Sequence, residues 1–188
     1  PDLTPEKSFG YNIGFEQDML GGDVNFAVDY FHSDLEDEIF TDFGVFPSTA
    51  RNRATESIRQ GVEVQARWTL NDQFRASGSM TFLESEENGG TESRRPEFLG
   101  SATLTWTAVE ALSVTASVDH TGSQFDSDFS TFPSTQRELD AYTLVSVNIA
   151  YDVNDIVTVT LRGDNLLDET YQEVIGYASQ GRGIYAGL

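Results

Sequence analysis

The sequence predicts an all-β protein: an antiparallel meander of about nine long strands, forming part of a transmembrane β-barrel. Apolar and polar residues alternate with a period of two along eight successive stretches. In a strand, successive side chains point to opposite faces of the sheet. In residues 61–70, for example, Val62 and Val64 share one face, and Glu63 and Gln65 share the other. The stretches are joined by connections that are alternately short and long.

The length of the alternation separates a membrane barrel from a soluble sheet. Five like-facing positions in one stretch cover roughly 26 Å. This is close to the apolar band of about 25 Å on an outer-membrane barrel. Strands of soluble sheets usually run about five or six residues. A soluble β-sandwich, with its apolar faces packed against each other, is the alternative, but the strand lengths favour apolar faces that meet lipid.

Each expected strand follows from this alternation. Strands are expected at residues 6–17, 24–43, 61–70, 74–82, 98–106, 112–119, 145–152, 157–164 and 184–188, the second of them ending in an acidic extension. Short turns are expected at 20–23, 71–72, 109–110 and 154–155, and long connections at 44–54, 84–95, 122–139 and 165–183. The two kinds of connection therefore sort to opposite ends of the sheet, as in outer-membrane barrels. No segment has a convincing helical period.

Aromatic residues of the apolar face lie near the ends of the expected strands. Such a distribution is typical of the aromatic girdles that meet lipid headgroups. The residues are Tyr11, Phe15, Tyr30, Trp68, Phe74, Phe82, Phe98, Trp106 and Tyr151.

Composition excludes some partners and suggests a fragment. The chain has 188 residues, a net charge of −20, no cysteine and only 11 Lys and Arg residues, which are scattered. Nucleic acid is not an expected partner, because phosphate binding needs clustered basic residues. The chain begins at Pro1, and nine strands cannot close a bacterial barrel, which takes an even number. We therefore expect a piece of a longer protein.

Motifs at both ends of the chain carry a family resemblance. Residues 1–8, which include Pro5, Glu6 and Ser8, resemble the Pro-x-Leu-x-Pro-Glu-x-Ser stretch that enters a late barrel strand in TonB-dependent outer-membrane receptors. Residues 163–171 are similar to the Asn-Leu-Phe-Asp-x-x-Tyr signature of that family, with Leu167 in place of the usual Phe. The matching residues are Asn165, Leu166, Asp168 and Tyr171, followed by Gly181 and Arg182 before the last expected strand.

The resemblance implies a 22-stranded barrel in the outer membrane, of which residues 1–188 are the C-terminal part, without the plug domain and the earlier strands. It implies that TonB, acting through the plug, drives uptake of a small nutrient bound at the extracellular loops. Lipid and lipopolysaccharide would surround the wall. Residues 168–174, 176–177 and 181–182 look most like cobalamin (vitamin B12) receptors, as do 94–96 and 137–143. Ferric-siderophore receptors and a passive porin remain the alternatives.

Charged residues gather at the end with the long loops. The motif residues there are expected to shape loops, because Asn and Asp bond nearby backbone amides. Acidic residues of the long loops are expected to form a solvated rim, with Ca²⁺ binding as the alternative. Basic residues near this rim are candidates for contact with lipopolysaccharide phosphates or ligand groups: Arg51, Arg53, Arg94, Arg95 and Arg137.

Catalysis and a resident cofactor or metal are not expected. His32 and His120 are the only histidines, and neither has clustered zinc ligands in the sequence. A Ser-His-Asp site built from Ser117, Asp119 and His120 is disfavoured, because adjacent strand residues face opposite ways. Residues 181–183 lack the strand-then-helix context of a phosphate loop.

Overall fold

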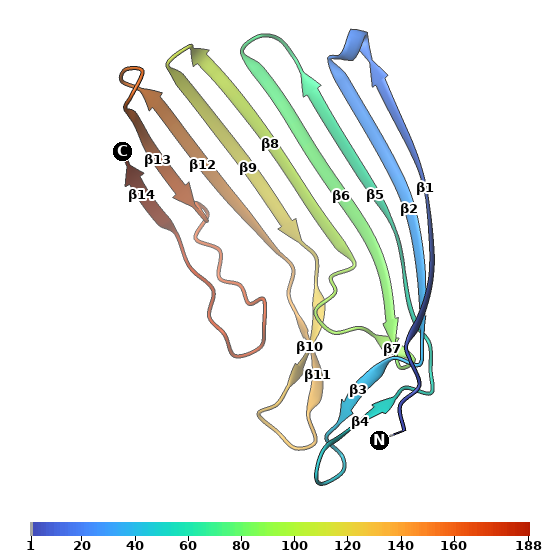
Figure 1. Ribbon diagram of the computed structural model, residues 1–188. Coiled ribbons are helices and arrows are strands. Elements are labelled where there is room, and N and C mark those ends of the chain that lie inside the picture. The colour runs from blue at the N-terminus through green and yellow to red at the C-terminus, as the bar shows by residue number, and fades with distance from the viewer. Residues whose placement is uncertain (1) are drawn as a thin grey trace.

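The computed structural model describes residues 2–188 and contains one large curved sheet (Figure 1). Its strands pair antiparallel in the order β1-β2-β5-β6-β8-β9-β12-β13-β14, so each long strand lies beside the next long strand of the chain. Within the described residues, no helix is long and apolar enough to cross a membrane. The expected meander of about nine strands is confirmed.

The nine strands of the main path are mostly long. They are β1 (Lys7–Met19), β2 (Val24–Glu36), β5 (Ser57–Thr69), β6 (Phe74–Glu87), β8 (Phe98–Val109), β9 (Leu112–Thr121), β12 (Tyr142–Asp152), β13 (Thr158–Asp164) and β14 (Gly183–Gly187). The short β7 (Gly90–Thr91) pairs with the end of β6.

The short connections lie at the upper end of the sheet in Figure 1 and are held by local hydrogen bonds. Between β5 and β6, Oδ1 of Asn71 accepts hydrogen bonds from the backbone N–H groups of Gln73 and Phe74, at 2.9 and 3.0 Å. Asn154 does the same between β12 and β13. The first turn is the 3₁₀ segment η1 (Leu20–Gly22), in which Gly21 has a φ of 74°. Glycine accepts this left-handed backbone without a steric cost.

Two of the expected long loops contain short hairpins that the alternation did not indicate. β2 ends at Glu36, and Asp37 has a positive φ of 56°, so the expected extension to residue 43 is a separate element. Strands β3 (Ile39–Asp42) and β4 (Thr49–Asn52) form one hairpin, and β10 (Gln124–Asp128) and β11 (Thr135–Leu139) form the other. Both project beyond the lower ends of the main strands (Figure 1). Their strands carry mixed polar residues, so the apolar period does not reveal them.

The register confirms that the apolar residues share one face. Val28 pairs with Val64, and Val64 pairs with Met80. On the other face Ser79 lies opposite Ser101, with their hydroxyl oxygens 2.8 Å apart. Among residues 2–188, Leu139 is the only buried hydrophobic side chain. The apolar face therefore packs against no second layer, which excludes the sandwich alternative.

Aromatic residues mark both ends of the apolar face. Toward the short turns, the rings of Phe74 and Trp106 stack with centroids 6.1 Å apart. Toward the long loops, Phe82 and Phe98 meet at 4.9 Å. Trp106 and Phe98 are eight residues apart on β8, or about 27 Å, the height of a membrane-spanning apolar band. Phe15, expected near a strand end, instead lies between the two levels, opposite Val28.

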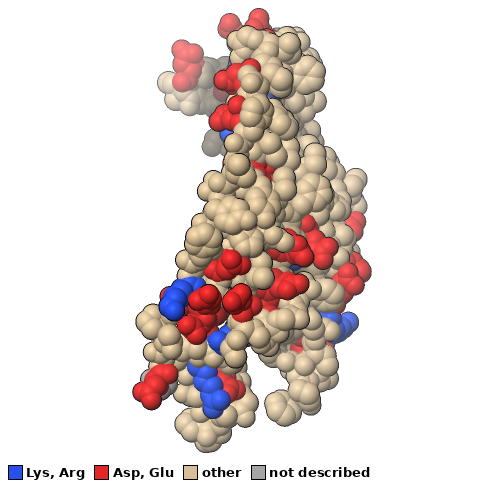
Figure 2. Space-filling model, turned by 90° about the vertical axis from the view of Figure 1, so that its right-hand side faces the viewer, with Lys and Arg blue, Asp and Glu red and all other residues tan. Residues whose placement is uncertain are grey.

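Charged side chains also mark the two ends of the sheet. In the side view of Figure 2, acidic and basic side chains gather toward the two ends of the molecule, and the surface between them is largely uncharged. Lysine and arginine lie mostly in the lower part, among the acidic residues of the long-loop end. A membrane-spanning wall with wet ends has this distribution.

Candidate functional site: the long-loop rim

The long-loop rim comprises residues 37–56, 88–97, 122–141 and 165–182, which connect the main strands at the lower end of Figure 1. All five predicted rim arginines lie in it. Each arginine forms an ion pair with a carboxylate of the rim or of an adjoining strand end. These acidic partners are not indicated by the sequence.

Glu92 forms the centre of the rim between β6 and β8. Nε and Nη2 of Arg59 donate hydrogen bonds of 2.8 and 2.9 Å to its two carboxylate oxygens. Ser85 donates a further bond, and Nε of Arg95 lies 3.3 Å from Oε1. Burial alone would raise the pKa of Glu92, but the bonds from Arg59 and Ser85 outweigh it and lower the pKa to about 2. Glu92 is thus an ionised anchor that holds residues 88–97 against the sheet.

Arg53 is mostly buried and contacts two glutamates. Its side chain is 19% exposed and lies between Glu38, 3.3 Å from Nε, and Glu87, to which Nη2 donates a hydrogen bond. The guanidinium also covers the ring of Phe40 at 4.8 Å. Ser57, 1% exposed, donates a 2.7 Å hydrogen bond to Glu38. This cluster fixes the β3–β4 hairpin to β5 and β6.

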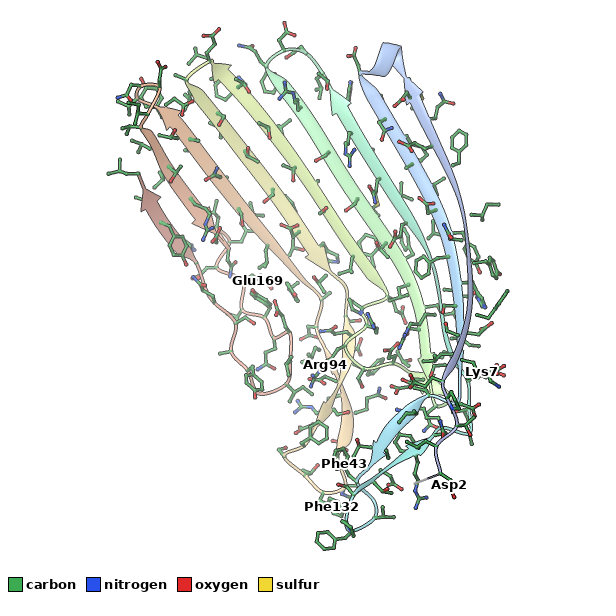
Figure 3. The ribbon with its side chains drawn as sticks, viewed as in Figure 1. Asp2, Lys7, Phe43, Arg94, Phe132 and Glu169 are labelled. Carbon is green, nitrogen blue, oxygen red and sulfur yellow. The ribbon has the colours of Figure 1, made fainter. Side chains whose placement is uncertain are left out.

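Arg94 fixes the other hairpin. Its Nε donates a 2.8 Å hydrogen bond to Oδ1 of Asp126, whose side chain is 1% exposed. The backbone N–H of Ile175 donates to Oδ2 of the same carboxylate at 2.9 Å. Burial opposes the ionised form of Asp126, but these bonds prevail and lower its pKa. One carboxylate therefore joins residues 88–97, β10 and the loop before β14; Figure 3 shows Arg94 at this junction.

An open cavity of about 740 Å³ lies beside this junction. Its lining comes from β10, the β10–β11 turn, β11 and the loop before β14, and includes Arg94, Asp128, Phe129, Arg137 and Tyr177. Cavities of this size suit cofactor-sized ligands. Hydrogen bonds from Ser130 and Arg137 lower the pKa of Asp128 to about 2. Two of the five predicted rim arginines, Arg94 and Arg137, line this cavity.

A second cavity, of about 620 Å³, lies near the loop end of β5 and β6. It is lined by Tyr30, Val62 and Phe82 of the apolar face together with Glu84 and Arg95. The hydroxyl of Tyr30 donates to Gln60 at 3.0 Å, and Gln60 donates to Glu84 at 2.8 Å. This cavity opens at the boundary between the apolar face and the rim.

The N-terminal motif ties β1 to the first hairpin. Glu6 accepts a 2.6 Å hydrogen bond from the backbone N–H of Ile39, and Ser8 lies 3.4 Å from Ser33 on the next strand. Pro5 lies between Thr4, which exchanges two hydrogen bonds with Asn52, and Glu6. Pro1, the first residue of the motif, lies outside the described residues.

The C-terminal motif closes the loop before β14. Asn165, 5% exposed, donates to the carbonyls of Glu169 and Gln180 and accepts from the N–H of Glu169. The backbone N–H of Leu166 donates to Val145 at 2.8 Å. Asn165 thus makes the loop-shaping contacts that its residue type suggests.

The remaining motif residues brace the same loop. Asp168 accepts a 3.0 Å hydrogen bond from the backbone N–H of Arg182, which follows Gly181. The ring of Tyr171 stacks on Tyr142 with centroids 4.2 Å apart, and burial raises the pKa of Tyr171. The first contact ties the two ends of the loop together, and the second holds Tyr171 against β12.

The histidines lie apart from any catalytic arrangement. Nδ1 of His120 is 2.8 Å from Oγ1 of Thr143, and its ring contacts Phe98. Asp119 pairs with Ser101 and Leu144 on the opposite face of the sheet. His32 lies 3.0 Å from Asp34. Across residues 2–188, no cluster of three or more His, Asp or Glu side chains is arranged to hold a metal ion.

The rim also contains a repeat that the sequence analysis missed. Residues 42–51 and 128–137 both read Asp-Phe-x-x-Phe-Pro-Ser-Thr-x-Arg, although the two segments are 86 positions apart, as 128 − 42 shows. Each copy forms the turn and part of the stem of one rim hairpin. A comparison of the chain with itself would have revealed it, because seven of the ten residues are identical and stand at the same positions in both copies.

Comparison with known proteins assigns the chain to a family. The family model described as TonB dependent receptor-like, β-barrel, matches residues 1–166. The fold and rim thus define a wall segment of an outer-membrane β-barrel, and the chain belongs to the TonB-dependent receptor family. The proteins of this family are transport receptors.

The chain spans less than a third of the length of each relative described below. The vitamin B12 transporter BtuB of Vibrio cholerae serotype O1 is 32% identical over 106 residues, which are 55% of this chain and 17% of that protein. The ferric enterobactin receptor PfeA of Pseudomonas aeruginosa has a similar structure, with a TM-score of 0.81 at 19% identity, covering 98% of this chain and 31% of that one. The siderophore receptor PirA of Acinetobacter baumannii gives 0.81 at 17% identity, covering 98% and 32%. These structural likenesses establish the fold.

Proposed function

We propose that residues 1–188 form the C-terminal part of the barrel wall of a receptor for energy-coupled uptake of a scarce nutrient, with cobalamin as the first candidate. The observation that supports cobalamin as the ligand is the 32% identity to a vitamin B12 transporter. Family membership supports the transport function and disfavours an enzyme. In this proposal the wall belongs to a 22-stranded barrel that surrounds a plug domain moved by TonB.

The cavity beside Arg94 and Arg137 is the proposed place of ligand contact. It faces the end with the long connections, which is the extracellular end of an outer-membrane barrel. The side chains of Arg94 and Arg137 are 52% and 63% exposed, so their guanidinium groups can contact a ligand while they remain paired with aspartates. Arg53, 19% exposed between two glutamates, is proposed to be structural. Arg51 and Arg95 are half exposed and suit lipopolysaccharide phosphates.

The motif residues are proposed to have no ligand contact. Glu6 and Asn165 direct their polar atoms to backbone groups of neighbouring segments. Substituting Asn165 should therefore disturb the loop before β14, and ligand affinity only through that loop.

A ferric siderophore is the second candidate ligand. It is supported by the similarity in fold to siderophore receptors that cover 98% of this chain. Because these receptors are less than 20% identical, the fold alone does not choose between the ligands.

Uptake by the full-length receptor tests the proposal. Cells that produce the receptor as their only route for cobalamin should take up labelled cyanocobalamin in the presence of TonB and lose uptake, but not surface binding, without it. If the second candidate is correct, labelled ferric enterobactin should instead show TonB-dependent uptake and TonB-independent surface binding. Uptake that is independent of TonB and does not saturate would replace the proposal with a passive porin.

A further inference from the structure

Arg67 and Arg75 differ from the other arginines of the chain. Within residues 2–188, neither has a carboxylate at ion-pair distance, although both side chains are exposed. Asp72, in the turn between β5 and β6, is the nearest acidic residue in the sequence and pairs with neither of them. Each of the other arginines pairs with a carboxylate: Arg51, Arg53, Arg59, Arg94, Arg95, Arg137, Arg162 and Arg182.

The two unpaired arginines are neighbours on the polar face of the sheet. Arg67 lies opposite Ser77, and Arg75 is the next residue of that face along β6. Side chains in this diagonal relation are about 7–8 Å apart. Two like charges at that distance repel each other, and no ion pair within residues 2–188 offsets the repulsion. An anion that contacts both guanidinium groups would offset it.

Hydroxyl groups surround the two arginines. An open cavity of about 220 Å³ is lined by both of them and by Thr69, Ser77, Thr103 and Thr105. Hydroxyls donate hydrogen bonds to anionic oxygens, and a guanidinium binds phosphate through two parallel N–H groups. The cavity is several times larger than the roughly 30 Å³ that one water occupies in the liquid, so it has room for a phosphate group. Its donors come from β5, β6 and β8 and can reach such a group from several sides.

This cavity continues toward the long-loop end of the sheet. A second hollow, of about 160 Å³, shares Arg67 and Ser77 with the first and extends along the polar face to Ser79 and Ser101. The hydroxyl oxygens of Ser79 and Ser101 are 2.8 Å apart. The two arginines therefore stand at the short-turn end of an uncharged, hydroxyl-lined stretch of the polar face.

Carboxylates occupy the polar face on the other side of the arginines. Glu16 and Asp18 of β1 both accept hydrogen bonds from Asn25 of β2. Asp29 of β2 lies opposite Glu63 of β5, so two further carboxylates share this side. Fixed charges of one sign repel an anion, and charges of the other sign attract it. An anion inside the barrel is thus directed away from β1 and β2 and toward the two arginines.

The arginine site is distant from the long-loop rim. Arg67 and Ser57, at the loop end of β5, are ten positions apart on one strand, or about 33 Å. The short turns of an outer-membrane barrel are at its periplasmic end, which is the upper end in Figure 1. A ligand held at the rim therefore reaches the arginines only after it has passed along the polar face.

We propose that Arg67 and Arg75 form an anion site that holds the phosphodiester of cobalamin on its way to the periplasm. This inference rests on the proposed function and deepens it. The phosphodiester is the negatively charged group on the periphery of cobalamin, and the carboxylates of β1 and β2 oppose its passage. Contacts from the two guanidinium groups offset that opposition near the exit. The site therefore speeds uptake and contributes nothing to binding at the rim.

The test compares two labelled probes in cells that produce the full-length receptor. Cyanocobalamin has the phosphodiester, and dicyanocobinamide lacks it together with the nucleotide. In Arg67→Gln with Arg75→Gln, TonB-dependent uptake of cyanocobalamin should slow about tenfold, because hydrogen bonds to a charged group are lost. Uptake of dicyanocobinamide and surface binding of both probes should stay as in the unaltered receptor.

Three further measurements control for charge, position and folding. Arg67→Lys with Arg75→Lys keeps both charges and should restore most of the uptake of cyanocobalamin. Arg162→Gln is the matched control, since Arg162 lies at the level of Arg75 on the polar face but pairs with Asp164 at 3.1 Å. It should take up both probes as the unaltered receptor does. Heat-resistant gel mobility shows that each variant is folded; if the double variant is not, the two single variants take its place.

The other outcomes separate the inference from the proposed function. Unchanged uptake of cyanocobalamin in the double variant would overturn the inference alone. Equal slowing of both probes would also overturn it, because the arginines would then serve a contact without phosphate, such as one with the plug. Selective slowing that does not depend on TonB would retain the inference and overturn energy-coupled uptake. An unaltered receptor that takes up no cyanocobalamin would overturn the inference together with the first candidate ligand.

Discussion

Arg94 and Asp126 form an ion pair of 2.8 Å in which the carboxylate is almost completely buried while the guanidinium remains half exposed. The same carboxylate accepts the backbone N–H groups of Ser127 and Ile175, at 2.8 and 2.9 Å. A side chain on β10 therefore holds two loops that are distant in the sequence. Its two partners Arg94 and Ile175 both line the proposed binding cavity, so Asp126 braces part of the cavity wall.

Replacing that carboxylate should loosen the cavity wall but leave the barrel folded. Asp126→Asn keeps the size of the side chain but removes its charge and one accepting oxygen, which costs about 1–3 kcal/mol locally. We expect faster proteolysis within residues 172–182 and unchanged melting of the sheet. Glu169→Gln is the control. Glu169 lies in the same loop, and within residues 2–188 its hydrogen bonds are made by its backbone only. Equal protease resistance of both variants would contradict the role assigned to Asp126.

The anchor at Glu92 should survive moderate acid. Its pKa is about 2 in the folded rim and 4.5 ordinarily. A lowered pKa contributes stability that is fully present above pH 4.5 and is lost as the pH falls through about 2. The protection factors of residues 88–97 against hydrogen exchange should therefore stay high at pH 4 and fall toward pH 2. A loss of protection that is already complete at pH 4 would show that the Arg59 contact is weaker than the geometry indicates.

Charge on the two faces of one strand should have opposite consequences. Met80 lies on the apolar face and the adjacent Ser79 on the polar face of β6. Met80→Arg should destabilise the barrel in lipid by about 1–3 kcal/mol, because it places a charge inside the apolar band, between the middle of the bilayer and the aromatic level at Phe82. Ser79→Arg is the matched control and should cost much less, since water or the plug meets that face. The free energy of unfolding in vesicles measures both; equal costs would contradict the assignment of faces.

Gly61 should not tolerate a side chain. A Cβ at this position would lie 2.3 Å from the carbonyl oxygen of Phe82 and 2.7 Å from the ring of Phe31. Because the first neighbour is backbone, Gly61→Ala forces the strands to shift, and we expect a loss of about 1–3 kcal/mol. Gly90→Ala, where a Cβ meets nothing within 4 Å, should be neutral. Thermal unfolding of the two variants in one detergent makes the comparison, and equal melting temperatures would refute the crowding at Gly61.

The sequence by itself determined the wall. The alternation at Val62, Val64, Glu63 and Gln65 predicts strands and their faces, because the two-residue period is a local property of extended backbone. The short turns at Asn71 and Asn154 were also found, since each Asn bonds to the backbone two and three residues further on. Motifs at both ends indicated the family.

Only the tertiary structure decided what the rim is made of. The alternation gave no sign of the hairpins β3–β4 and β10–β11, because their short strands lie in water and have no apolar face to repeat. Asp126 and Glu92 were simply acidic residues in the sequence. Their partners come from loops up to 49 positions away, as Ile175 is from Asp126. Such contacts depend on how the sheet brings its loops together, and no local spacing encodes that convergence.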